Sequence, residues 1–192
     1  FLILDCWDNF EYFKLNPKGK ELKPQLPLPV RLVGLRLDKI EQANDSGHAD
    51  ITIREIAKLH LQIATLPKES VVIKEAAAAL ARLDEENFWI SLSHDRLEFL
   101  RAEIKPLFCT VSDADFKAMR FERDLLEYSL ALLNEEKEQA EIIQEGIVEQ
   151  ISELPLSVSF VKQEEALIRA AQTCHYWAKA DEDAYDELVS KL

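Results

Sequence analysis

The stretch SDADFKAMRFERDLLEYSLALL, residues 112–133, carries the strongest helical pattern in this 192-residue chain. Small polar residues that can cap the start of a helix stand at its beginning, from Ser112 to Asp115. Apolar residues then recur at three-residue, four-residue and heptad spacings, which place them on one helix face. They are Met119, Phe121, Leu125, Leu126, Tyr128, Leu132 and Leu133. We expect a helix whose apolar face is mostly buried.

A narrower apolar stripe follows in residues 135–154, with polar residues between its members. The stripe consists of Ala140, Ile143, Ile147, Ile151 and Leu154. Steps of three and four residues place all five on one side of a helix. The two segments are therefore predicted to pack as an antiparallel pair of helices, joined around Asn134 and Glu135.

The rest of residues 29–192 also favours helices, because the whole chain has only four glycines and seven prolines. The patterns predict helices at 29–43, 50–66, 68–83 and 93–105, with Pro106 ending the last of these. A short extended piece at 157–160 should precede a helix to residue 176 and another over 181–192. His60 lies on an apolar stripe and is expected in the core. The expected fold class is mainly α, an irregular bundle of about seven helices.

The sequence before these helices has a different character. Phe-Leu-Ile-Leu-Asp, residues 1–5, is a continuous apolar run that is typical of a strand buried on both faces. Such a strand needs neighbouring strands, and no comparable series follows, so we expect it to be left over from an α/β domain that lies upstream. The expected organisation is a terminal strand and aromatic run at 1–13, a basic linker with prolines at 14–28, and a helical domain at 29–192.

Charge divides the chain in the same way. The formal net charge is -13, but residues 1–40 carry seven Lys or Arg against five acids, while residues 41–192 carry 16 against 31. The acidic body should repel a phosphate backbone, whereas the segment from residue 14 to residue 36 has six bases and one acid. Any contact with a DNA backbone is therefore expected from this segment. The candidate residues are Lys14, Lys18, Lys20, Lys23, Arg31 and Arg36.

The motifs that support catalysis are not found. Gly19-Lys20 is the one Gly-Lys pair, and Glu21 follows it where a phosphate-binding loop needs Ser or Thr. The four histidines form no spaced pair, and the adjacent Cys174 and His175 would diverge on a helix, so neither a metal nor a cofactor is expected. Acidic pairs such as Glu135-Glu136 are expected to be solvated helix faces. No catalytic residue is assigned.

Three widely separated cysteines argue against a disulfide framework and favour a reducing compartment. No apolar stretch approaches the roughly 18 residues that cross a bilayer, and no basic region precedes the first apolar run as in a signal peptide. The sequence therefore predicts a soluble, cytoplasmic protein without a membrane partner.

Residues 1–13, FLILDCWDNFEYF, resemble the stretch after the last helicase motif in the R (motor) subunits of type I restriction enzymes. In those subunits a strand of the second RecA-like domain ends in an acid, and an aromatic run leads to a helical C-terminal region. The resemblance implies a parent that is an ATP-dependent type I site-specific deoxyribonuclease, using ATP and Mg²⁺ through motifs upstream of this chain. It implies no catalytic residue here.

The first hypothesis for function follows from this resemblance. The helical domain would assemble the motor subunit with the methyltransferase and specificity subunits of the same system, and DNA would be bound by the parent enzyme. A second hypothesis is an accessory domain that contacts DNA through residues 14–36. A third is an unrelated helical protein-interaction adaptor or an independent enzyme.

Overall fold

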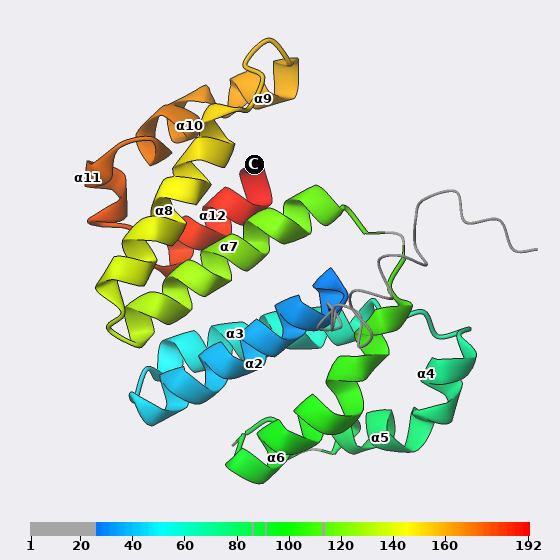
Figure 1. The fold of residues 1–192 in the computed structure, drawn as a ribbon. Helices are drawn as coiled ribbons and strands as arrows, with labels where there is room; N and C mark the ends of the chain where they lie inside the picture. The colour runs from blue at the N-terminus through cyan, green and yellow to red at the C-terminus, as the bar shows by residue number, and fades with distance from the viewer. Residues whose placement is uncertain (1–25, 86, 91, 113) are drawn as a thin grey trace, which may run out of the picture.

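The computed structural model describes residues 26–85, 87–90, 92–112 and 114–192, and in these ranges all regular structure is helical. The expectation of a mainly α domain is confirmed for this part of the chain. The predicted strand at 1–5, the aromatic run and all but the end of the linker lie outside the described residues. Figure 1 shows the helices arranged in two groups, with α2 and α7 lying between them.

The α-helices are α2 (Leu28–Asp45), α3 (Ala49–Ala64), α4 (Val71–Glu75), α5 (Ala77–Ala81), α6 (His94–Phe99), α7 (Phe116–Leu133), α8 (Lys137–Ser152), α9 (Ser159–Gln163), α10 (Glu165–Ala171), α11 (Cys174–Trp177) and α12 (Glu182–Lys191). A 3₁₀ turn spans Arg82–Asp84, a π-helical turn spans Leu100–Ile104, and a 3₁₀ helix spans Lys105–Thr110. The described residues thus contain eleven α-helices where about seven were predicted, because two predicted helices are divided.

Helix α2 is buried on more than one side. It starts with a proline in its first turn, as expected, and the chain turns beyond it at Gly47, whose φ is 76°. The pattern of residues 29–43 predicts an apolar face of Val30, Val33, Leu37 and Ile40, and all four are buried. Leu32, Arg36 and Lys39, which lie on other faces, are buried as well. Helices α3 and α7 and the 3₁₀ helix at Lys105–Thr110 all pack against α2. This helix is therefore the centre of the fold.

Two separate hydrophobic clusters form around this centre. The first combines α2 and α3 with the segment from Leu66 to Val111, and its fully buried members include Ile40 and Leu59. The second combines α7 with the helices that follow it, and includes Ile147 and Trp177. Both clusters contain T-shaped aromatic pairs, which add to the free energy gained by burial.

The predicted pair of helices at 112–154 is confirmed as α7 and α8. Asp115 caps α7 by accepting hydrogen bonds from the backbone N–H groups of Lys117 and Ala118. The helices pack together on either side of a tight turn in which Glu135 has φ 60°. Leu132 was placed on the buried face, but it is 42% exposed. It is at the edge of the apolar face and lines an open pocket beside the start of α3.

The predicted helix at 68–83 is wrong as a single helix, because it breaks at Ala76, where ψ is 7°. The change of direction keeps both Ile73 and Leu80 against the first cluster. The predicted helix to residue 176 is likewise divided, into α9, α10 and α11. The extended piece predicted at 157–160 is a turn followed by α9, since the described residues offer it no partner strand.

Pro106 does not end its helical segment, contrary to expectation. It occupies the first turn of the 3₁₀ helix at Lys105–Thr110, where the N–H that proline lacks has no helical partner to lose. The π-helical turn just before it accommodates the change in hydrogen-bond pattern. The chain therefore stays helical from His94 to Thr110.

Candidate functional site

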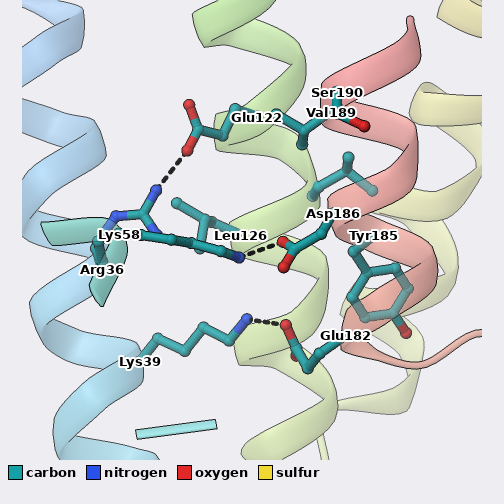
Figure 2. Close-up of a pocket in the computed structure, with 11 residues that line it drawn as sticks. Arg36, Lys39, Lys58, Glu122, Leu126, Glu182, Tyr185, Asp186, Val189 and Ser190 are labelled. Carbon is teal, nitrogen blue, oxygen red and sulfur yellow. Dashed lines mark hydrogen bonds and ion pairs between the residues drawn. The ribbon is translucent and has the colours of Figure 1, made fainter. Parts of the chain in front are cut away.

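The ionisable side chains of four helices converge between the two hydrophobic clusters (Figure 2). The centre of this group is Glu55 on α3, whose side chain is 0% exposed. Arg36 of α2 donates a hydrogen bond to one carboxylate oxygen of Glu55, and Lys39 donates to the other at 3.1 Å. Gln62 accepts a further bond from Arg36 Nε at 3.1 Å. The centre is therefore a buried carboxylate shared by two buried cations.

The same two cations connect Glu55 to the second half of the fold. Arg36 also donates to Glu122 on α7. Lys39 Nζ lies 2.6 Å from Glu182 at the start of α12, and Ser129 of α7 donates to the other oxygen of Glu182 at 2.5 Å. Each cation thus bonds both to α3 and to a helix of the second cluster.

Ion pairs between α3 and α12 extend the group toward solvent. Lys58 lies 3.2 Å from Glu55 and also pairs with Asp186. Arg54 pairs with Asp186 at 2.8 Å and with Asp183 at 2.5 Å. We call the whole set the ion-pair network. It comprises Arg36, Lys39, Arg54, Lys58, Glu55, Glu122, Glu182, Asp183 and Asp186.

A pocket of about 240 Å³ opens beside the ion-pair network. Its polar wall is formed by Arg36, Lys39 and Lys58 with their partners, and Leu126, Val189 and the ring of Tyr185 form part of its apolar wall (Figure 2). Within the described residues, every buried side-chain nitrogen and oxygen has a hydrogen-bond partner. The charges that line this pocket therefore satisfy one another.

The pKa values of two carboxyl groups in the network also indicate that its charges pair with one another. Burial alone would raise the pKa of Glu55, but Arg36, Lys39 and Lys58 outweigh it and hold this pKa below its ordinary value. Asp186 behaves alike, since burial is outweighed by Lys58 and Arg54 and its pKa is lowered. A general acid at neutral pH needs a raised pKa, whereas the pKa values of Glu55 and Asp186 are both lowered. These carboxylates are therefore suited to holding helices together through ion pairs.

Acid should weaken the ion pairs that hold these helices together. A carboxyl group whose pKa is lower in the folded protein than in the unfolded chain stabilises the fold while it is ionised, and this stabilisation is lost as pH falls. For Glu55 and Asp186 the loss begins below their unfolded values, 4.5 and 3.8, and continues down to the lowered folded values. We expect the melting temperature to be nearly constant from pH 7 to 5 and to fall below pH 4.5, by about 2–4 °C for each kcal/mol lost.

Calorimetry or circular dichroism melting at each pH would test this expectation. A melting temperature that stayed constant from pH 5 to pH 3 would contradict it. The variant Glu55→Gln, which cannot titrate at this position, should show a shallower decline than the natural chain.

Two of the six candidate DNA contacts, Arg31 and Arg36, lie in the described part of the chain, both on α2. Lys14, Lys18, Lys20 and Lys23 lie outside the described residues. The Arg31 side chain is 47% exposed and lies 3.5 Å from Glu127. Arg36 is 1% exposed and its guanidinium bonds to two carboxylates, so it is not free to contact a phosphate. The prediction for Arg36 is corrected, because a base that stands within a helix buried on several sides pairs inside the fold.

The stripe predicted on the second helix, Ile53, Ile56, His60 and Ile63, is only partly buried. Ile56 and Ile63 pack against the first cluster, whereas Ile53 is 68% exposed and His60 lies at the surface, with its ring edge-to-face on Trp89 at 4.0 Å. The fully buried residues of α3 are Thr52, Glu55 and Leu59. Sequence reasoning missed Glu55 because an acid was assigned to solvent. The signal present in the sequence was Arg36 and Lys39, two bases one helical turn apart among the apolar residues Leu35, Leu37 and Ile40.

The other residues considered for catalysis or metal binding do not come together in one site. Glu135 to Lys137 form the turn and start of α8, and Cys174 is exposed at the start of α11. Among the described residues, no group of three His, Cys, Asp or Glu side chains could hold a metal ion, and no helix is both long and apolar enough to cross a membrane.

Comparison with protein-family models, curated proteins and solved structures gives no match to this chain.

Proposed function

We propose that residues 29–192 form a non-catalytic assembly domain, which joins the motor subunit of a type I restriction enzyme to its methyltransferase and specificity subunits. The observation that carries the proposal is that the ionisable side chains which converge inside the fold bond to one another across four helices. Side chains used in this way hold a scaffold together. The resemblance of residues 1–13 to motor subunits supplies the parent enzyme, with its ATP, Mg²⁺ and DNA.

The surface supports a protein partner. Several large apolar side chains are well exposed, including Ile90 at 77%, Phe160 at 71% and Ile142 at 63%. Apolar side chains of this size gain free energy when a partner protein covers them. Residues 41–192 carry an excess of acids, which disfavours a nucleic acid as the partner of this body.

The test is association of the full 192-residue chain with the methyltransferase core of the same restriction system, measured by calorimetry and size-exclusion chromatography. We expect a complex with a dissociation constant in the micromolar range or tighter, since interfaces of standard size give such values. Binding that is unchanged by Phe160→Ser, Ile142→Ser and Ile90→Ser together would place the contact elsewhere on the domain. No association, in conditions where the complete motor subunit binds, would refute the proposal.

A further inference from the structure

Helix α12 is attached differently on its two sides. On one side it packs on α7, and its two buried side chains, Tyr185 and Leu188, belong to the second hydrophobic cluster. On the other side, long basic side chains of α2 and α3 reach across to its carboxylates (Figure 2). Arg54 and Lys58 supply three of these ion pairs, and both side chains are partly exposed. Ion pairs that water reaches contribute little to stability, so α12 is weakly attached to α2 and α3.

Two pockets lie between α12 and its neighbours. The pocket of about 240 Å³ beside the ion-pair network lies along α12, and another of about 420 Å³ lies at its start, between α3 and α7. Glu182 and Tyr185 line both pockets, so the first turn of α12 stands between them. Without α12 the two pockets would join into one groove, which we call the α12 seat. Its walls include Lys39, Arg54, Lys58, Leu125, Leu126 and Leu132.

The contacts of α12 show what kind of helix the α12 seat accepts. The three bases of the seat bond to carboxylates at the first, second and fifth positions of α12, which are Glu182, Asp183 and Asp186. The buried side chains of Tyr185 and Leu188 stand at the fourth and seventh positions, one helical turn apart. The seat therefore matches an amphipathic helix with acids on one face and large apolar side chains on the next.

Charge favours an acidic occupant at these contacts. Without α12, the ion-pair network keeps its four bases but only two of its five acids, Glu55 and Glu122. Two positive charges would then lack partners. Asp50 and Glu135 also line the larger pocket, but both are exposed and neither pairs with a base of the network in the described ranges, so water and salt screen them. The bases therefore favour a helix that carries carboxylates where α12 does.

We infer that the α12 seat is a binding site for an acidic amphipathic helix of a partner protein, and that α12 occupies it in the free chain as an internal competitor. The partner helix displaces α12, while α2, α3 and α7 keep their mutual packing and the bond of Arg36 to Glu122. A helix of ten residues is too short to be stable alone, so the displaced α12 loses its helical hydrogen bonds. The inference does not rest on the proposed assembly function, since it concerns which helix fills this seat.

Hydrogen exchange of the full chain, followed by mass spectrometry, tests the inference. The competitor is a synthetic peptide with the sequence of residues 179–192, and the chain is labelled with ¹⁵N so that its own fragments differ from the peptide in mass. The readout is the exchange rate of the α12 amides at pH 7, without peptide and with peptide at about 1 mM. The internal control is α8, which lines neither pocket of the seat. The control peptide carries Glu182→Gln, Asp183→Asn and Asp186→Asn.

We expect the acidic peptide to speed exchange in α12 at least about fivefold, because a tethered helix competes at an effective concentration in the millimolar range. Exchange in α8 should change by less than about twofold, and the control peptide should have no effect. Unchanged exchange in α12 would overturn the inference, as would equal acceleration of α12 and α8 or an equal effect of the control peptide. Dimers of the chain alone that exchange α12, detected by size-exclusion chromatography, would make a second copy the occupant and would also overturn it.

Discussion

Glu55→Gln should lower the free energy of unfolding by about 3 kcal/mol, a large part of the 5–15 kcal/mol that stabilises an ordinary domain. The side chain keeps its size, so the effect arises from charge alone. In the natural chain Glu55 faces Arg36, Lys39 and Lys58, and Arg36 and Lys39 are almost fully buried. Removing the shared carboxylate charge leaves these cations with too little negative charge beside them, and buried charge without a partner is costly.

The loss should lie near the lower end of the range for a broken buried pair, about 3–5 kcal/mol. Arg36 keeps its bond to Glu122, and Lys39 keeps its bond to Glu182 at 2.6 Å. Urea unfolding at pH 7, followed by far-ultraviolet circular dichroism, measures the difference. The matched control is Glu69→Gln, because Glu69 also pairs with a lysine, at 2.8 Å, but is 94% exposed.

The control should change stability by less than about 0.5 kcal/mol, as expected for an exposed ion pair. Equal effects of Glu55→Gln and Glu69→Gln would show that the ion-pair network contributes no more than a surface pair. The double variant Glu55→Gln with Arg36→Met should recover part of the loss, since it also removes one of the buried cations that Glu55→Gln leaves poorly paired.

The sequence predicts the long helices well, and the reason is periodicity. In α7 and α8, apolar residues such as Leu125 and Ile147 recur at steps that only a helix places on one face, and the buried faces follow that pattern. Gly47 and Asp115 also mark the helix boundaries by their local chemistry. The short helices are different. Near Ala76 the sequence is compatible with a continuous helix, and the break there depends on the curvature of the core that it covers.

The ion-pair network could not be predicted by the same reasoning. Periodicity assigns charged residues to solvent, so Arg36 was predicted as a DNA contact and Glu55 was not singled out, although both are buried. Their burial depends on which helices meet, and partners such as Glu182 lie more than a hundred residues away in sequence. A single sequence does not show directly which distant helices come into contact.

Leu37→Ala and Ile147→Ala should each lower the free energy of unfolding by about 3 kcal/mol, within the range of 2–5 kcal/mol for a large apolar side chain removed from a core. Both side chains are 0% exposed, but Leu37 belongs to the first hydrophobic cluster and Ile147 to the second. Leu61→Ala on α3 and Ile142→Ala on α8 are the matched controls, since these side chains are 71% and 63% exposed and should cost less than about 0.5 kcal/mol.

The pair of variants also tests whether the two clusters unfold together. Helix α2 packs on both α3 and α7, and the ion-pair network ties these helices to α12, so loss of either cluster should expose the charges that hold the other. Trp89 reports on the first cluster and Trp177 on the second. Variants that lack Trp7 and keep only one of these two tryptophans separate the two fluorescence signals. We expect Leu37→Ala to shift both signals to the same lower urea concentration, as in a two-state transition. A shift of the Trp89 signal alone would mean that the clusters are independent units, and that the buried charges between them do not couple their unfolding.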